Sequence, residues 1–150
     1  MIEVTNESEQ VLISNTDNVK YSAIALRTNS AQCLNGWLNF NLDNPQFNII
    51  GGGIYQVTFN ANVTSAEVGN VGLALFADGN QLSGTEMDTS ISTAGLWRNI
   101  SFTKRIRVCP RGNVSLVIKS VPTTAYNGTS TDTQIPVLKN VNVIVERLGN

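Results

Sequence analysis

Histidine is missing from the 150-residue sequence, and charged residues make up only 14% of it. A typical soluble domain has about 25% charged residues. Without imidazole, the chain has no side chain whose unperturbed pKa lies near 7, and it has no Ser–His or Cys–His nucleophile pair. We therefore expect a protein that is not an enzyme, with no catalytic residues, no cofactor and no metal site.

Cysteine is scarce too, since Cys33 and Cys109 are the only two in the sequence. Two cysteines are too few for a cysteine-rich zinc site. They predict two reduced, buried thiols that pack as small hydrophobic side chains, with one disulfide as the alternative if the fold brings them together.

Long apolar runs are also lacking. No run approaches the 18 residues that identify a membrane-spanning helix, so we expect no membrane insertion. The first ten residues, MIEVTNESEQ, are acidic and polar and do not look like a secretory signal. No window of eleven or more residues repeats apolar side chains at helical spacing, which argues against helices.

Uncharged polar residues are abundant instead, with 19 Asn and 14 Thr. Thr suits a pleated strand, and Asn suits turns. Short apolar runs between turn residues predict one all-β domain over 1–150, with residues 1–9 as an extended N-terminal arm and 122–134 as an exposed loop. The predicted strands are 10–14, 19–27, 36–42, 46–50, 53–63, 70–77, 80–87, 95–108, 112–121 and 135–147.

Three local patterns in this series are clear. In 53–63, the apolar residues Tyr55, Val57 and Phe59 alternate with polar ones, which predicts a strand with one buried and one wet face. Asp78-Gly79 lies between two apolar runs and predicts a β-hairpin. The run 51–53, three glycines, predicts a sharp turn before the strongest strand.

Four segments in a fixed order carry a resemblance to a known family. They are the G-I-Y-Q-V-T-F strand in 53–63, G-L-A-L-F-A-D-G at 72–79, L-S-G-T-E-M at 82–87 and the closing strand at 140–148. This order resembles the tumour-necrosis-factor-like (TNF-like) jelly roll, the fold shared with the globular heads of complement. It is similar above all to the version found in virion proteins of phages of Gram-positive bacteria and in spore-surface glycoproteins.

The resemblance implies an all-β, TNF-like jelly-roll sandwich that assembles as a homotrimer. It implies a non-enzymatic structural protein on a virion surface, such as a capsid decoration or head-fibre protein, whose partner is a major capsid or other virion protein. The alternatives are a receptor-binding, lectin-like tip for a cell-surface glycan and a structural protein of a bacterial cell or spore surface. Such heads often follow a collagen-like stalk, which is not seen before residue 10. If Met1 is the native start, a free-standing knob is expected, and if the sequence is a fragment of a longer protein, a fibre is the alternative.

Charge is divided unevenly along the chain, because residues 1–97 hold two basic and nine acidic residues, whereas 98–150 hold eight and two. Five basic residues are candidates for docking on an acidic surface: Arg98, Lys104, Arg105, Arg107 and Arg111. The alternatives are that they pair with acids on a neighbouring subunit or that they form the solvated face of one long strand, which is the interpretation we favour. Nucleic acid is not an expected partner, because the isoelectric point is 5.3 and no aromatic residues interleave the basic run.

Aromatic residues supply the candidates for a trimer interface, which are Tyr55, Phe59, Trp97 and Phe102. Packing in the core of one subunit explains such residues as well as an interface does. Lys104 falls on the same side of its strand as Phe102, among apolar residues. The commoner explanation is a bulge or a lysine stem that carries its ammonium to the edge, and the alternative is an interfacial position.

Two small groups of polar residues complete the candidates. Tyr126, Asn127 and Asp132 lie in the loop 122–134 and have the stacking and hydrogen-bonding groups that a glycan site needs. Glu86 and Asp88 fall on one face of a strand, as an acid–base pair or calcium ligands would. Solvated acids near a strand end are the interpretation we favour for this pair.

Overall fold

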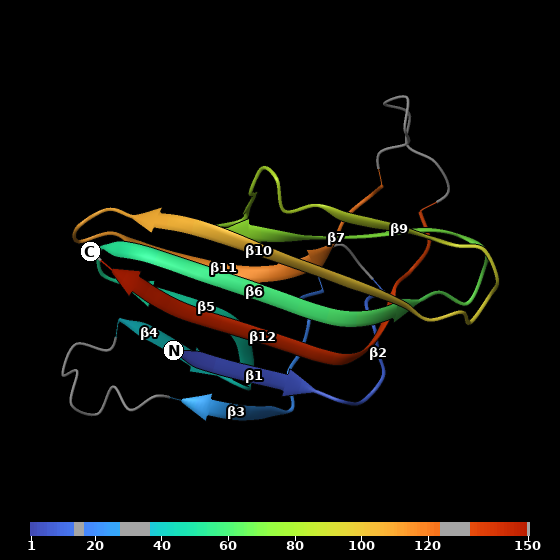
Figure 1. The fold of residues 1–150 in the computed structure, drawn as a ribbon, viewed down its shortest axis with the longest axis horizontal. Helices are drawn as coiled ribbons and strands as arrows, with labels where there is room; N and C mark the ends of the chain where they lie inside the picture. The colour runs from blue at the N-terminus through green and yellow to red at the C-terminus, as the bar shows by residue number, and fades with distance from the viewer. Residues whose placement is uncertain (14–16, 28–36, 124–132, 150) are drawn as a thin grey trace.

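Two antiparallel sheets packed face to face make up the structure, a computed structural model that describes residues 1–13, 17–27, 37–123 and 133–149. The first sheet has the order β10 (Arg98–Val108), β6 (Gly53–Thr64), β12 (Val137–Gly149), β1 (Ile2–Asn6) and β3 (Ala23–Arg27), with β2 (Gln10–Val11) also paired to β12 (Figure 1). We call it the long-strand sheet.

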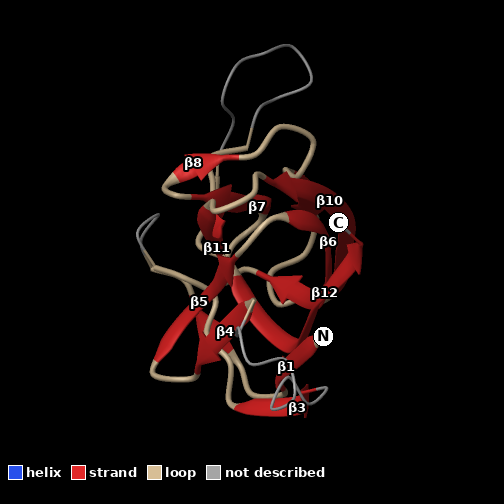
Figure 2. Ribbon diagram, turned by 90° about the vertical axis from the view of Figure 1, so that its left-hand side faces the viewer, coloured by secondary structure: helices blue, strands red, loops and turns tan. Residues whose placement is uncertain are grey.

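The second sheet has the order β4 (Leu38–Asn41), β5 (Asn44–Ile50), β11 (Asn113–Ser120), β7 (Gly69–Ala77) and β8 (Asn80–Gln81), with β9 (Met87–Ile91) also paired to β7. We call it the short-strand sheet. The view in Figure 2 runs along the sandwich and shows the two sheets on either side of the core. No stretch of the described residues forms a helix long and apolar enough to cross a membrane.

Alternation along β6 positions the core, as the sequence predicted. Tyr55, Val57 and Phe59 are buried between the sheets, whereas Gln56 and Thr58 lie on the outer face. Burying a large apolar side chain contributes roughly 1.5–3 kcal/mol, so this one strand anchors much of the sandwich. The short-strand sheet contributes the facing layer, which includes Phe47, Ile49, Leu73, Leu75, Leu116 and Ile118.

The hairpin at Asp78-Gly79 is also confirmed. Both residues have positive φ, 48° and 82°, as the two central residues of a type I′ turn require. The turn joins β7 to β8, and the carboxylate of Asp78 accepts a hydrogen bond from the Ser115 N–H at 2.9 Å. A glycine-rich turn at 51–53 precedes β6, again as predicted.

The N-terminal segment differs from its prediction. Residues 2–6 are no arm: they form β1, which pairs with β12 on one side and β3 on the other. Ile2 and Val4 are 3% and 0% exposed, because β1 covers that end of the core. This strand could not be recognised from the sequence, because its five residues include only two apolar side chains.

The predicted strand 80–87 is wrong in its extent. It is replaced by β8 and β9, and the residues between them leave the sheet. Thr85 accounts for the break, because its buried hydroxyl bonds to the backbone N–H and C=O of Leu75 and to the C=O of Leu82. A side chain there takes the place of ladder hydrogen bonds.

Candidate functional site

Two turns pack against each other at the end of the sandwich where β10 passes into β11. One is the glycine run 51–53, and the other is Cys109–Gly112, closed by a hydrogen bond from the Gly112 N–H to the Cys109 C=O at 2.8 Å. The Gly51 N–H donates to the Gly112 C=O at 3.1 Å. A methyl group added at Gly52 would lie 2.8 Å from the backbone of Pro110, so only glycine allows this approach.

Between the two turns lies a cavity of about 310 Å³ lined by two arginines. Arg107 is the last outward-facing residue of β10, and Arg111 is the third residue of the Cys109–Gly112 turn. Both side chains are exposed, and within the described part of the chain neither has a hydrogen-bonding or ion-pair partner. Gly52, Gly53, Val108 and Pro110 complete the lining.

A third arginine approaches the same glycine turn from β12. The Arg147 guanidinium lies over the Trp37 ring at 3.7 Å and donates to the Gly52 C=O at 2.8 Å. A methyl group at Gly53 would lie 2.7 Å from Arg147 Nε. Tyr55 donates its hydroxyl to the Gly51 C=O at 3.2 Å, so side chains from β6 and β12 hold the turn from two sides. Burial raises the pKa of the Tyr55 hydroxyl, and this effect outweighs the charge of Arg147 and the hydrogen bond with it, which lower that pKa.

The other predicted basic residues do not join this group. Arg105 lies on the outer face and donates to the Gln56 amide at 3.1 Å, and Gln56 donates to the Glu146 carboxylate at 3.2 Å. Arg98 lies at the opposite end of β10. Lys104 lies on the core-facing side and donates to the Ser83 C=O at 2.9 Å. The five-residue basic patch is therefore wrong as a unit, because strand alternation and length separate its members.

Lys104 follows the commoner of its two explanations. It is half-buried and opposite Val57, but its stem reaches the loop between β8 and β9, where the Ser83 C=O accepts a hydrogen bond from its ammonium. A lysine can bury its methylene groups in this way while its ammonium stays hydrogen-bonded at the edge.

Glu86 and Asp88 lie together, as their spacing predicted. Burial raises the pKa of the Asp88 carboxyl to about 6, and the negative charge of Glu86 and a hydrogen bond with it add to the shift. Asp88 lies over Gly72, where an added methyl group would be 2.7 Å from its Oδ1. Among the described residues there is no group of three or more His, Cys, Asp or Glu side chains that could hold a metal. Both residues are exposed overall, as solvated acids would be, and the Asp88 carboxyl is partly covered where it packs over Gly72.

Two of the four aromatic candidates for a trimer interface are wrong. Tyr55 and Phe59 are 0% exposed within a single chain, so no neighbouring subunit can touch them. Phe102 is half-buried and stacks on Phe59 at 5.8 Å between ring centres. Trp97 is half-buried beside Lys139, whose ammonium lies 4.0 Å from the ring centre. Only Trp97 and Phe102 keep surface that another subunit could contact.

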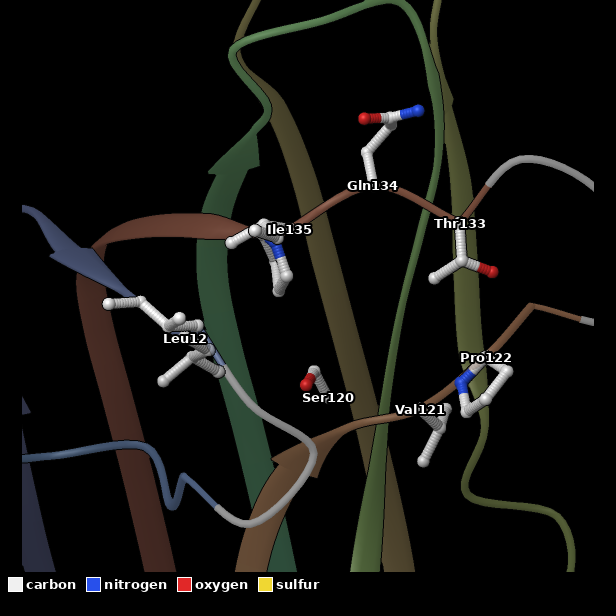
Figure 3. Close-up of a pocket in the computed structure, with 9 residues that line it drawn as sticks. Leu12, Ser120, Val121, Pro122, Thr133, Gln134 and Ile135 are labelled. Atoms are coloured by element: carbon white, nitrogen blue, oxygen red, sulfur yellow. The ribbon is translucent and has the colours of Figure 1, made fainter.

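A second cavity, of about 160 Å³, lies at the far end of the sandwich (Figure 3). It is mainly apolar, with Leu12, Ile135 and Val121 among its lining residues. Its Thr133 hydroxyl already accepts a hydrogen bond from the Thr123 N–H at 3.0 Å. Its lining residues include no charged side chain, so this small pocket offers no acid, base or ion for catalysis or for binding a charged ligand.

The remaining predictions concern residues of which little or nothing is described. Tyr126, Asn127, Asp132 and Cys33 lie outside the described residues. Cys109 is a free thiol and is exposed in the β10–β11 turn, so the prediction that it is buried is wrong. It follows the last residue of β10 and begins the turn Cys109–Gly112, which lies at the surface.

Sequence reasoning missed how the cavity between the two turns is built. Arg107 and Arg111 were candidates, but nothing predicted that the glycine run would face them or that Arg147 would approach from β12. Two features of the sequence bear on it: three consecutive glycines, and Cys-Pro-Arg-Gly, which has the Pro and Gly of a tight turn.

Comparison with known proteins identifies the fold. No family model matches the sequence, and no curated protein matches it closely enough to count as a relative. Among solved structures, the globular domain of zebrafish complement 1qA protein matches with a TM-score of 0.54 and 12% identity, over 95% of this chain and 94% of that one. The Eiger TNF of S. frugiperda matches with a TM-score of 0.60 and 9% identity, over 98% and 90%. At such low identity, the likeness shows the fold alone.

Proposed function

Because the chain has the TNF-like jelly-roll fold, we propose that it is a non-enzymatic, homotrimeric structural protein of a virion surface, such as a capsid decoration or head-fibre protein. The assignment to a virion rests on the order of sequence motifs, and the trimer rests on the fold and on one surface of the structure. That surface is the outer face of the long-strand sheet.

Across β10, β6 and β12, the middle of this face carries no charged side chain, and Glu3 of β1 borders it, where its carboxylate accepts a hydrogen bond from the Asn142 amide at 2.6 Å. The residues of these three strands form two rows, which the register places side by side. One row is Ser101, Asn60 and Asn142, and the other is Thr103, Thr58 and Ile144. A sheet face that stays in water normally carries charged side chains, whereas the centre of a subunit interface is depleted of them. This uncharged centre is the observation that carries the proposed trimer.

The sequence supports a non-enzymatic role. It lacks histidine, and the Glu86–Asp88 pair is exposed and lines neither of the two cavities described above. Three identical knobs on a particle would add their weak contacts, so a structural protein needs no tight single site.

A matched pair of variants tests the trimer. Ser101→Arg places a charge on the proposed interface, and Ser90→Arg places the same charge on an exposed residue of the short-strand sheet. Light scattering should give three times 16.2 kDa for the wild type and for Ser90→Arg at every dilution, and 16.2 kDa for Ser101→Arg. A monomeric wild type would overturn the trimer.

Immunogold labelling of a producing culture tests the virion. An antibody against the chain should decorate the surface of particles. Label confined to cell or spore surfaces would instead favour a cell-surface structural protein, and would overturn the virion assignment.

A further inference from the structure

We propose that the cavity between the turns 51–53 and 109–112 is a binding site for a carboxylate side chain of an acidic protein segment. The site itself is argued from its own residues. The clause that its ligand is a protein segment rests on the proposed function, since a structural protein of a particle docks on other proteins.

Two arginine side chains of this cavity are available to a ligand. A guanidinium presents planar N–H donors that match a carboxylate, and surface arginines commonly find one within their own chain. Here Arg105 is already engaged through Gln56, whereas Arg107 and Arg111 have no partner within the described residues. Both line one cavity of about 310 Å³, which is large enough for a side chain to enter.

The backbone of Arg111 has an unusual conformation for an arginine. Its φ is +65°, in the left-handed region, and it follows Pro110 in a turn closed by the hydrogen bond between Gly112 and Cys109. In a turn with proline second and positive φ third, the third residue is normally glycine or asparagine. A strained arginine at this position costs stability, and such residues are concentrated at functional sites. Folding alone would favour glycine here, so the side chain has a separate use.

Neighbouring elements support the cavity from behind. Gly52 contacts the Pro110 backbone directly, which fixes the turn that carries Arg111. Arg147 lies on the other side of the glycine turn and adds positive charge, while its own donors reach Gly52 and its face covers Trp37. The result is a rigid, positively charged recess at the end of the molecule that also holds the C-terminus of the chain (Figure 1).

Binding of fluorescein-labelled hexaglutamate tests the site, measured by anisotropy at low salt on the full chain. Arg107→Gln combined with Arg111→Gln should weaken binding at least tenfold, because both donors are lost. Arg98→Gln is the control for charge: it removes one positive charge, half of what the double variant removes, from the other end of β10 and should change the affinity less than twofold. Equal loss in the control, or no saturable binding by the wild type, would overturn the proposal.

Arg111→Gly separates binding from folding. Glycine relieves the positive φ, so this variant should unfold at the same temperature as the wild type or higher while its affinity for hexaglutamate falls at least threefold. Unchanged affinity would overturn the role of Arg111.

Competition identifies the class of ligand. Six-nucleotide oligothymidylate or inorganic phosphate that displaces hexaglutamate at lower concentration than unlabelled hexaglutamate would overturn the assignment to a protein carboxylate. Light scattering on the same samples keeps the two proposals apart. A trimer that binds no hexaglutamate overturns this site and leaves the proposed trimer intact.

Discussion

Asp88 is the residue whose protonation the fold changes most clearly on the surface. Burial and the neighbouring Glu86 raise its pKa from 3.8 to about 6. The folded state thus binds this proton more tightly than the unfolded chain. The contribution to stability is complete below a pH of about 4 and is lost as the pH rises through 6.

Asp88→Asn should therefore be at least as stable as the wild type at pH 7. The gain should be under about 1 kcal/mol, because the pair is exposed and screened by water. Urea unfolding from pH 3 to 8 measures it: the wild type should lose stability between pH 4 and 6 relative to the variant. Parallel curves for the two proteins across that range would contradict the raised pKa.

The sequence could predict that Glu86 and Asp88 share a face, since period two along a strand fixes that. It could not predict the raised pKa, because the larger cause is burial. That burial comes from Gly72, which has no side chain to hold Asp88 away from the neighbouring strand. Gly72 and Asp88 lie side by side only because β7 pairs with β9, and that pairing belongs to the tertiary fold.

Among elements, the β7–β8 hairpin gives the sharpest prediction. Gly79 has a φ of +82° and no atom within 4 Å of an added methyl group, so Gly79→Ala tests backbone conformation without a clash. A left-handed non-glycine residue costs roughly 1–2 kcal/mol. The variant should lose about 1 kcal/mol of unfolding free energy in urea.

Gly149→Ala is the control for that loss. It also has open space around an added methyl group, but its backbone does not require glycine. It should change stability by less than about 0.5 kcal/mol. Equal losses in the two variants would mean that the positive φ at Gly79 does not cause the effect.

Elements were predictable where alternation is long and turns are explicit. β6 runs for twelve residues with one face apolar, and Asp78-Gly79 is a typical sequence for a type I′ hairpin turn. β1 was missed because a short strand gains its stability from neighbours on both sides, which only the tertiary fold supplies. The break after β8 depends on the Thr85 hydroxyl, and a threonine within a strand pattern looks like any other strand residue.

At the scale of the molecule, the sequence shows that basic residues are concentrated after residue 97, but it could not predict where these residues lie in space. The five candidates Arg98, Lys104, Arg105, Arg107 and Arg111 fall close together in sequence. In the structure, Lys104 faces inward, Arg98 lies at the far end, and Arg105 joins a row with Gln56 and Glu146. Only Arg107 and Arg111 line one cavity. Alternation separates faces, and an eleven-residue strand separates ends by roughly 35 Å.

The proposed trimer makes stability depend on concentration, which gives a test independent of mass. Unfolding three bound chains releases three particles from one, so each tenfold rise in concentration stabilises a chain by two-thirds of about 1.4 kcal/mol, or about 0.9 kcal/mol. For a domain of this length, that raises the melting temperature by roughly 3 °C.

Thermal unfolding of the wild type and of Ser90→Arg, followed by circular dichroism, should show the melting temperature rise by roughly 6 °C between 1 and 100 μM, because that range spans two tenfold steps. Ser101→Arg should unfold at one temperature throughout, because a monomer unfolds without dissociating. A wild-type melting temperature that does not change with concentration would mean that the uncharged rows of the long-strand sheet face solvent. In that case the low charge of this face would reflect the composition of the whole chain, and the docking cavity at Arg107 and Arg111 would act on a single copy.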